Sequence, residues 1–335
     1  MYPETRQALN GFLTQVAKLN GVTSVAETFN VAPSVQQTLE NRMQESSDFL
    51  KKINVIGVRE QEGEKIGLGV TGPVASRTDT TNAERQTRDV SDLNNQRYRC
   101  EQTNYDTHLR YAKIDAWAKF PDFQVRLRNA IVQRQALDRI MIGFNGTSVA
   151  ADTNLVTNPL LQDVNKGWLH NLRTDAPARH MAEVVSGSGQ ITVGASGDYK
   201  NLDALIYDAK YALIDPWYRD DPGLVAIMGS DLLHDKFFGL IDIDQSPTES
   251  LAANVILSQK RVGGLVPVTV PYFPANAVLI TRLDNLSIYY QTGARRRHLI
   301  DNPKRDRIEN FESSNDAYPV EDYGCAALIE NITAA

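Results

Sequence analysis

The segment Gly67–Gly72 is a literal Gly-x-Gly-x-x-Gly and is the sharpest local match to a chemical motif in the 335-residue chain. In a dinucleotide-binding site this pattern follows a strand and opens a helix whose N-terminus faces the pyrophosphate. Residues 65–70 are typical of a strand, but Pro73 and a polar segment without helical periodicity follow the last glycine. The glycines therefore favour a twisted or bulged strand. An intracellular nucleotide-binding enzyme using Gly67–Gly72 is kept as an alternative.

Histidines, paired carboxylates and cysteines are the other residues that could carry chemistry. The five histidines lack the spacing of metal ligands: His108, His170, His180, His234 and His298. Two pairs of adjacent acids could act in acid–base catalysis, but such pairs in loops are usually solvated: Asp220–Asp221 and Glu321–Asp322. The cysteines have no nucleophile motif and are too few for a disulfide framework, which is typical of a reducing compartment, although one bridge stays open: Cys100 and Cys325. We predict no catalytic residue, no cofactor and no metal site.

A cluster of cations lies within Arg295–Arg307. It holds six basic side chains and a histidine against two aspartates: Arg295, Arg296, Arg297, Lys304, Arg305 and Arg307 with His298, against Asp301 and Asp306. Such a cluster binds phosphates of nucleic acid or pairs with an acidic patch on a neighbouring subunit. Because the chain has 35 basic and 41 acidic residues and a net charge of -6, we favour the contact between subunits. A DNA-binding structural protein using Arg295–Arg307 remains an alternative.

The most regular element that could position side chains is a helix predicted over residues 122–144. Apolar residues recur there at helical spacing: Phe123, Leu127, Ile131, Leu137, Met141 and Phe144. At 1.5 Å per residue this helix is about 35 Å long. For the arginines on its other face we favour exposure to solvent over contact with a neighbour or with nucleic acid: Arg126, Arg128, Arg134 and Arg139.

Two further helices are predicted near the N-terminus. Residues 5–19 show the apolar spacing of a short amphipathic helix, and residues 20–33 are a small, polar linker. A second helix begins at Pro33, where Ser34 and Gln37 have the spacing of a capping box. The first helix is marginal alone and needs a surface to lie on.

A projecting arm is predicted over residues 54–112. Between strand-like flanks, the segment Thr71–Gln96 has few apolar residues and no aromatic one. A structureless loop of this length is unusual in a compact domain. Because an isolated two-stranded arm is marginally stable in water, we expect another subunit to hold it.

The remainder of the chain alternates helices and strands from about residue 200. Strand-like runs lie at 265–270, 277–282, 286–290 and 326–332. The final strands have no helix of their own, so we expect them to return to the domain that holds the long helix.

Composition limits the class of protein. The chain is 42% hydrophobic and 23% charged, which is ordinary for a globular protein of about two domains. The N-terminus lacks the pattern of a secretory signal. The longest apolar runs, such as Leu224–Met228, are far shorter than the roughly 20 residues of a membrane span. We expect a soluble protein made inside the cell, with no membrane contact.

Short sequence segments spread over nearly the whole chain resemble those of one family. In the first half they are Met43–Leu50, Gly63–Gly67, Gly69–Gly72, Asp122–Gln124, Arg128–Ile131, Gly143–Gly146, Asn158–Pro159 and Leu161–Val164. In the second half they are Asp215–Tyr218, Ile256–Arg261, Val270–Pro274, Leu286–Tyr290 and Val320–Tyr323. Each segment alone is weak evidence of a relationship. Together and in this order, the segments resemble the major capsid proteins of peduovirus-type tailed phages.

This resemblance implies an α+β fold of the Hong Kong 97 type. Such a fold has an N-terminal arm, an extended hairpin called the E-loop, a peripheral P-domain with a long spine helix, and an axial A-domain. On this chain the parts would be the arm at 1–53, the E-loop at 54–112, the P-domain at 113–199 with the spine helix at 122–144, the A-domain at 200–305, and a return to the P-domain at 306–335.

The resemblance also implies a function and partners. It implies a major capsid protein, not an enzyme, that self-assembles into hexamers and pentamers of an icosahedral head enclosing phage double-stranded DNA. The expected partners are other copies of the chain, a scaffolding protein, a prohead protease, a portal protein and the packaged DNA in weak contact. The expected location is the virion, with assembly in the cytoplasm of the bacterial host.

Two covalent changes occur during maturation of proteins with this fold: proteolytic cleavage, which the resemblance implies here, and a cross-link, which we do not expect. Residues 1–31 would be a scaffold-like arm that the prohead protease removes, with cleavage expected near Ala26–Pro33. The covalent cross-link of some proteins with this fold needs a specific Lys–Asn pair and a catalytic acid. We cannot place such a set in this sequence and predict no cross-link.

Overall fold

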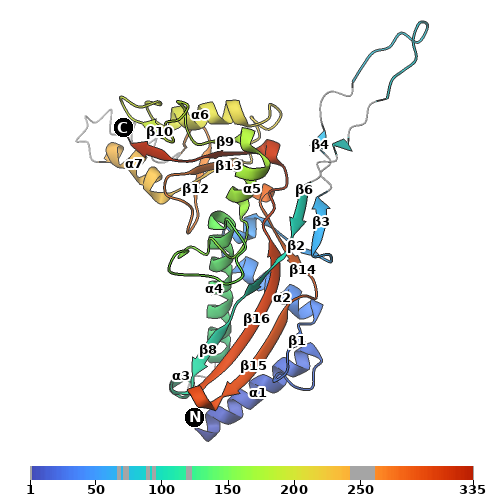
Figure 1. Ribbon diagram of the computed structural model, residues 1–335, viewed down its shortest axis with the longest axis vertical. Helices are drawn as coiled ribbons and strands as arrows, with labels where there is room; N and C mark the ends of the chain where they lie inside the picture. The colour runs from blue at the N-terminus through green and yellow to red at the C-terminus, as the bar shows by residue number, and fades with distance from the viewer. Residues whose placement is uncertain are drawn as a thin grey trace.

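The computed structural model describes residues 2–65, 69–70, 75–87, 91–92, 96–117, 123–241 and 261–334. These residues form a lower and an upper unit, an N-terminal segment that lies along the lower unit, and an arm that projects away from both (Figure 1). The lower unit is built on a seven-stranded sheet and the upper unit on a five-stranded sheet. Within the described residues, no helix combines the length and apolarity needed to cross a membrane.

The N-terminal segment contains two helices, a short strand and a 3-10 turn: α1 (Pro3–Asn20), β1 (Phe29–Asn30), α2 (Pro33–Glu45) and η1 (Leu50–Lys52). Helix α1 opens on Pro3 and ends at Gly21, whose φ of 66° suits glycine. Helix α2 begins directly at Pro33 and has no side-chain cap, so the predicted Ser34–Gln37 capping box is wrong. The fixed φ of proline already suits the first helical position, which places the serine inside the first turn.

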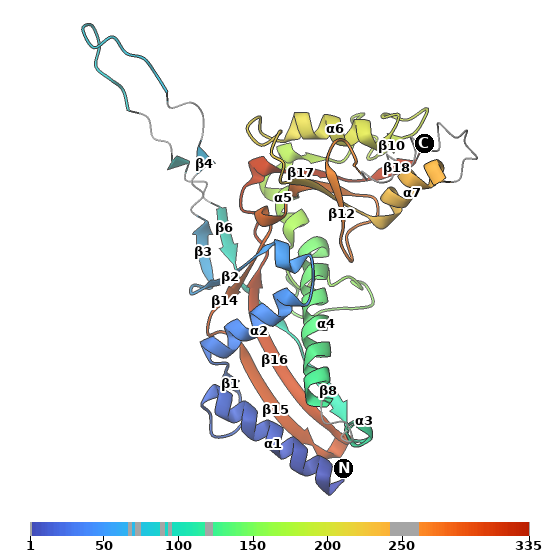
Figure 2. The same ribbon diagram turned by 180° about the vertical axis from the view of Figure 1, so that it is seen from behind.

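The lower sheet has the order β1-β15-β16-β14-β2, and β7 and β8 also pair with β16. Its other strands are β2 (Asn54–Val58), β7 (Glu101–Asn104), β8 (Thr107–Arg110), β14 (Ser287–Gln291), β15 (Arg296–Asn302) and β16 (Arg307–Ala317). Strands β15 and β16 form a long antiparallel hairpin closed by η4 (Pro303–Arg305). Helix α4 (Phe123–Asn145) runs along this sheet in both views (Figures 1 and 2) and confirms the helix predicted over 122–144. Helix α3 (Tyr111–Trp117) follows β8.

The upper sheet has the order β12-β11-β13-β17-β9. Its strands are β9 (His180–Met181), β11 (Leu224–Met228), β12 (Val266–Thr269), β13 (Val278–Arg282) and β17 (Ala326–Ile329). A separate parallel pair consists of β10 (Ile191–Val193) and β18 (Ile332–Ala334). The helices are α5 (Trp168–Asp175), α6 (Leu202–Leu213) and α7 (Ser230–Ile241), and further 3-10 turns are η2 (Pro177–Arg179), η3 (Leu283–Asn285) and η5 (Tyr323–Cys325). Leu205, Ile206 and Ala209 of α6 pack into the core of this unit.

The projecting arm is a two-stranded ribbon. Strand β3 (Glu62–Lys65) pairs with β6 (Gln96–Arg99), and β4 (Gly69–Val70) pairs with β5 (Ser91–Asp92), both antiparallel. The arm extends away from both units (Figure 1). It is narrower than the expected 54–112, because β2, β7 and β8 are strands of the lower sheet, where their hydrogen bonds are satisfied by β14 and β16.

The two units are joined at a waist, which the described chain crosses along three segments: 146–167, 283–286 and 318–325. Side chains of α5, which directly follows the first segment, bind residues in or directly after the other two. The Trp168 indole donates to Ser287 O at 2.8 Å, and the Asn171 amide donates to Tyr318 O at 2.9 Å. The Trp168 ring also lies edge-on to Phe144 and Tyr318, with centroid separations of 5.0 and 5.6 Å.

Two glycines allow α4 and α5 to meet closely at the waist. A Cβ on Gly143 would lie 2.2 Å from Cζ3 of Trp168, and a Cβ on Gly167 would lie 2.3 Å from the Gly143 carbonyl oxygen. Only a residue without a side chain fits at either position, so these glycines fix the approach of the two helices.

Strand pairing differs from the unit boundaries that the sequence suggests. Residues 200–305 were expected to form one axial unit, but β14 and β15 lie in the lower sheet. Of the expected return at 306–335, β16 joins the lower sheet, whereas β17 and β18 pair in the upper unit. The reason for β17 is its composition: Ala326–Ile329 is entirely buried and apolar, which suits a central strand between β13 and β9.

Candidate assembly surfaces

A buried cluster of five charges joins the N-terminal segment to the lower unit. Glu40 of α2, Arg139 of α4, Arg295 just before β15, and Glu312 and Asp316 of β16 are at most 6% exposed. The Arg295 guanidinium donates to Glu40 Oε1 at 2.9 Å and to Glu312 Oε1 at 2.8 Å. The Arg139 guanidinium donates to Asp316 at 3.0 and 3.1 Å and also pairs with Glu40. Glu40 therefore lies between two arginines from different elements.

The opposite charges of this cluster stabilise one another in their ionised forms. Burial alone would lower the pKa of Arg139, but the carboxylates of Asp316 and Glu40 raise it well above its ordinary value. Burial alone would raise the pKa of Glu312, but the nearby guanidinium of Arg295 helps to lower it. Removing one partner from such a cluster leaves an uncompensated buried charge, which costs about 3–5 kcal/mol. The cluster thus holds α2 against α4 and the β15–β16 hairpin.

The positions of Arg139 and Arg295 correct the sequence-based expectation. Both were predicted on a surface, and both are buried. Their shared partner Glu40 is 99 and 255 positions away in the sequence, so no local pattern reveals the pairing. The available signal was the spacing of Gln36, Glu40 and Met43, which puts Glu40 on the buried face of α2.

The remaining cations of the Arg295–Arg307 cluster do not form one continuous surface. Arg297 is half-buried and donates to Asn310 at 2.8 Å, and Arg307 pairs with Glu309 at 2.6 Å. The exposed members are Arg296, Lys304 and Arg305. Fewer outward-facing cations weaken the alternative in which this cluster binds DNA.

The arginines of the long helix α4 include both exposed and buried side chains. Arg128 is exposed, and Arg134 is largely exposed while pairing with Asp138 at 2.6 Å. The side chain of Arg126 lies outside the described residues. The predicted solvated face therefore holds for Arg128 and Arg134, whereas Arg139 belongs to the buried cluster.

Lys65 anchors the base of the arm to the waist. Its Nζ donates to the backbone oxygen of Val320 and lies 5.2 Å from the ring centroid of Tyr323. Burial lowers the pKa of Lys65, and the neighbouring charge of Glu321 opposes this shift. These contacts fix the direction in which the arm leaves the molecule.

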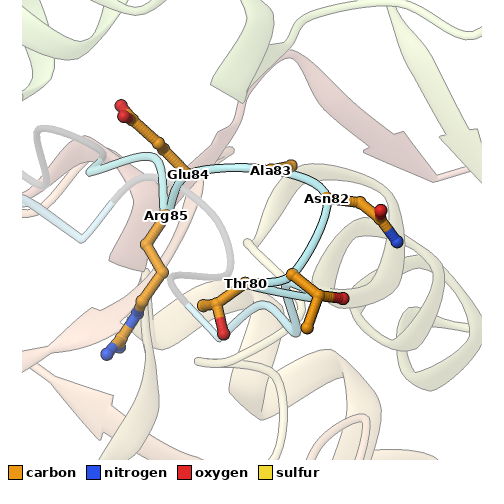
Figure 3. A pocket seen from close by; sticks show the side chains of 6 residues that line it. Thr80, Asn82, Ala83, Glu84 and Arg85 are labelled. Carbon is orange, nitrogen blue, oxygen red and sulfur yellow. The ribbon is translucent and has the colours of Figure 1, made fainter.

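The tip of the arm is an exposed turn. Asp79 accepts hydrogen bonds from the Thr81 amide at 3.0 Å and from the Asn82 side chain at 2.9 Å. Residues 75–87 are exposed apart from Thr78, which is partly buried. Figure 3 shows the shallow hollow lined by Thr80–Arg85, whose side chains spread in different directions. Ligand pockets have convergent polar groups, so this hollow resembles a contact surface more than a pocket.

Residues before α2 lie along the outer edge of β15. Phe29 and Asn30 pair with Arg297 and Arg296 of this strand. A small apolar cluster holds the segment in place: Val16, Val25, Phe29, Val31 and Leu299. At the start of α1, the Tyr2 amide donates to Asp115 at 2.9 Å. None of these contacts involves the charged side chains of the buried cluster that holds α2, although the Val31 amide donates to the backbone oxygen of Arg295 at 2.8 Å.

The glycine motif does not have the surroundings of a nucleotide site. Gly69 lies in β4, which pairs with β5, whereas Gly67 and Gly72 lie outside the described residues. Residues 75–87, which are described, contain no helix. The helix N-terminus that would face a pyrophosphate is therefore absent from this stretch.

Three of the four paired carboxylates make internal contacts. Asp221 pairs with Arg282 at 2.8 Å, and Asp220 beside it is exposed. Asp322 accepts a hydrogen bond from the Tyr218 hydroxyl at 2.7 Å. Glu321 accepts one from the Tyr289 hydroxyl at 2.9 Å. Asp221 and Glu321 thus fasten turns to strands, and Asp322 joins two turns.

The histidines are also dispersed. His180 lies 2.9 Å from Glu330, and His298 Nε2 lies 3.0 Å from the backbone oxygen of Ala26. Burial lowers the pKa of His170, which favours its neutral form. Over the part of the chain that is described, no group of three or more histidine, cysteine or acidic residues is arranged to hold a metal ion.

Cys100 and Cys325 are buried, free thiols. The bridge that the sequence leaves open is not formed. Burial raises the pKa of Cys100 to about 12 and that of Cys325 to about 11. Because the thiolate is the reactive form, both side chains are poor nucleophiles at neutral pH.

The comparison with protein families decides among these interpretations. A model described as phage major capsid protein, P2 family, matches residues 8–332. The chain belongs to this family. The capsid protein of Escherichia phage P2 is 52% identical over 340 residues, which covers 99% of this chain and 95% of that protein. The major capsid protein of Serratia phage KSP20 is 42% identical over 338 residues, with 99% and 97% covered.

Solved structures confirm the fold of this capsid protein. A chain in the procapsid of satellite phage P4, which includes the size determination protein, is 50% identical with a TM-score of 0.83 and covers 100% of this chain and 99% of its own. The capsid of an empty GTA particle has a TM-score of 0.52 at 15% identity, with 86% and 90% covered, and shows a shared fold alone. The predicted α+β fold of the Hong Kong 97 type is confirmed. As a phage capsid protein, the chain is a shell-forming structural subunit of the virion.

Proposed function

We propose that this capsid protein assembles into hexamers and pentamers that close into an icosahedral head around packaged double-stranded phage DNA. The observation that carries this proposal is the projecting arm. Residues 75–87 have almost no buried side chain, and a two-stranded ribbon alone is marginally stable in water. Laying the arm over a second copy supplies the buried surface that the arm lacks. Repetition of one such contact between copies generates closed rings.

The parts of the fold suggest roles within the shell. We assign the arm to the E-loop, the lower unit with α4 to the peripheral P-domain, and the upper unit to the axial A-domain. The net charge of -6 suits a container whose wall holds DNA only by weak contact. A portal protein and a scaffolding protein are further partners, and assembly takes place in the cytoplasm of the bacterial host. The subunit acts by assembly and not as an enzyme.

The N-terminal segment is proposed as a removable, scaffold-like arm. Residues 2–31 lie on the edge of β15 and depend on one small apolar cluster and a few polar contacts. Helix α2 is held separately by Glu40. A prohead protease that cuts near Ala26–Pro33 would release the segment without disturbing the buried charges. Deleting residues 2–31 should therefore leave the unfolding transition cooperative while impairing correct shell assembly, as followed by urea unfolding and electron microscopy.

Shortening the arm tests the shell function directly. We expect the full chain to sediment as capsomers or shells and to show particles by electron microscopy. A variant in which a short Gly-Ser turn replaces residues 69–92 should keep its secondary structure and melting temperature, because the arm lies outside both cores, but should form no closed shells. Glu84→Ala, which keeps the arm length, is the matched control and should assemble. A full chain that stays monomeric with a scaffolding partner present would contradict the proposal.

A further inference from the structure

The outward face of α6 and the turn after it carry exposed aromatic side chains. Tyr207 is 54% exposed, Tyr211 38% and Trp217 62%. The rings of Tyr207 and Tyr211 lie 4.7 Å apart between centroids. Lys210 Nζ lies 4.9 Å from the Tyr211 centroid, and the guanidinium carbon of Arg219 lies 5.8 Å from it. We call these five residues the aromatic patch.

The fold of the upper unit does not need this patch. Helix α6 packs into the core through its opposite face, with Leu205, Ile206 and Ala209 fully buried. Tyrosine, tryptophan and arginine are the residues that dominate the energetic centres of protein interfaces. The contacts of the Tyr207 and Tyr211 rings with each other and with the two cations hold this part of the patch in one arrangement, which reduces the side-chain entropy lost on binding. The patch therefore has the composition and order of a docking surface.

A second exposed apolar surface follows β9. Val184 is 45% exposed and Val185 60%. The carboxylate of Glu183 beside them accepts hydrogen bonds from the Gly187 and Gly189 amides at 3.0 and 2.9 Å, which lower its pKa and keep it ionised. We call residues 183–185 the valine patch. Strand β9 is an edge strand of the upper sheet, whereas α6 lies over the sheet (Figure 1). The two patches therefore lie on different segments of the unit, one on α6 and the turn after it and the other on the loop after β9.

We propose that the aromatic patch of one copy docks on the valine patch of a second copy. This inference rests on the proposed shell function and names one contact within it. The rings cover the two valines, and Lys210 and Arg219 come to lie opposite Glu183. The opposite charges of the two patches select a second copy as the partner. Because the two surfaces differ, the contact is head-to-tail and repeats around a ring.

Cysteine pairs placed on separate chains test this contact. Tyr211→Cys and Val185→Cys chains are assembled together and oxidised. A disulfide-linked dimer should form in the mixture, and the double variant should give a ladder that ends at the size of a closed ring. The native thiols are buried with raised pKa values, so they contribute little background. The matched control replaces Val185→Cys by Val156→Cys, which is 92% exposed on the loop after α4.

Three results would overturn the proposal: equal cross-linking with the control pair, cross-linking of Tyr211→Cys chains to one another, or no cross-link in a sample whose particles are visible by electron microscopy. The last result would leave the proposed shell function intact. Absence of particles from the wild-type chain would instead contradict that function. A reagent-accessible Tyr211→Cys thiol in complete particles would show that the patch serves an outside partner, and it would equally overturn the contact between copies.

A second measurement does not depend on disulfide geometry. Tyr211→Ser combined with Trp217→Ser should raise the critical concentration for assembly by about tenfold or more, as expected for the loss of interface aromatics. The melting temperature of the unassembled chain should stay unchanged, because both side chains are exposed. Val156→Ser is the control. An unchanged critical concentration for the double variant would contradict the docking role.

Discussion

At the residue scale, charged side chains lie in the interior of this subunit as well as on its surface. The two arginines that the sequence placed outside, Arg139 and Arg295, are buried with three acids. A buried ion cluster is weak evidence for net stability, but it is strongly sensitive to the loss of one member. The cluster therefore specifies where α2 sits, and single substitutions there should be costly.

Glu40 gives the sharpest test of this sensitivity. Glu40→Ala should lower the free energy of unfolding by about 3–5 kcal/mol, because two buried guanidinium groups lose a shared carboxylate. Glu45→Ala, on the same helix, removes only an exposed pair with Arg42 and should change it by less than about 1 kcal/mol. Urea denaturation measures both. Similar losses for the two variants would show that α2 is not fixed by the cluster.

Glu330 should make stability depend on pH. Burial alone would raise the pKa of Glu330, but hydrogen bonds from Arg173 and His180 lower it to about 2, against about 4.3 in an unfolded chain. The contribution of the ion pair is therefore fully present above about pH 4.3 and is lost as the pH falls toward the folded-state pKa. Glu330→Gln should be less stable than wild type at pH 7 by on the order of 2 kcal/mol, and the difference should shrink below about pH 4.5.

Urea midpoints at several pH values measure this dependence. The control is Glu84→Gln on the exposed arm, whose difference from wild type should stay near zero at every pH. A difference for Glu330→Gln that is constant down to pH 3 would mean that the carboxylate titrates normally in the folded state.

At the element scale, the regular helices were the predictable part of the fold. Helix α4 was confirmed to within one residue at each end, and α1 also follows the apolar spacing of residues 5–19. Strand β15 was missed because its residues, Arg296–Asn302, are mostly polar, and a charge cluster resembles a surface loop when its pairing strand is unknown. The assignment of β14 and β15 to the lower sheet depends on pairing with distant strands, which composition alone does not reveal.

Of the candidate surfaces, too, some could be predicted from local sequence and others could not. The polar composition of Thr71–Gln96 predicted a projecting arm, since low apolarity is a local property. The buried charge cluster was not predicted, because its members come from α2, α4, β16 and the residue before β15, which are far apart in the sequence. The aromatic patch was not singled out, since an exposed and a buried aromatic look the same in a helical pattern until the opposite face of the helix is known.

The crossing of α4 and α5 should tolerate no side chain at Gly143. Gly143→Ala would place a methyl group 2.2 Å from the Trp168 ring, which forces the two helices apart and should lower the melting temperature by several degrees or more. Gly11→Ala in α1 meets nothing within 4 Å and should leave stability equal or improved, because alanine favours helix. Thermal unfolding measures both. Equal melting temperatures for the two variants would mean that the waist can repack.

At the scale of the whole molecule, the chain combines two packed units with segments that lack a core of their own. This contrast should be visible by amide hydrogen exchange. In the unassembled chain residues 75–87 should exchange within seconds, whereas α5 and β17 should be strongly protected. In assembled particles the exchange of residues 75–87 should slow by tenfold or more, while that of β17 stays the same. Unchanged exchange at the arm after assembly would mean that no neighbour covers it.

The triple crossing at the waist has a mechanical consequence. A single connecting strand would act as a hinge, but three segments tied by Trp168 and Asn171 resist both bending and torsion between the units. A stress applied to one unit is then transmitted to the other instead of being absorbed between them. In the proposed head, pressure from packaged DNA would load the shell, and each subunit should then tilt as a rigid lever. Changes in the curvature of the shell must then come from sliding at the contacts between copies. The arm is the part of the subunit that can bend to follow this movement.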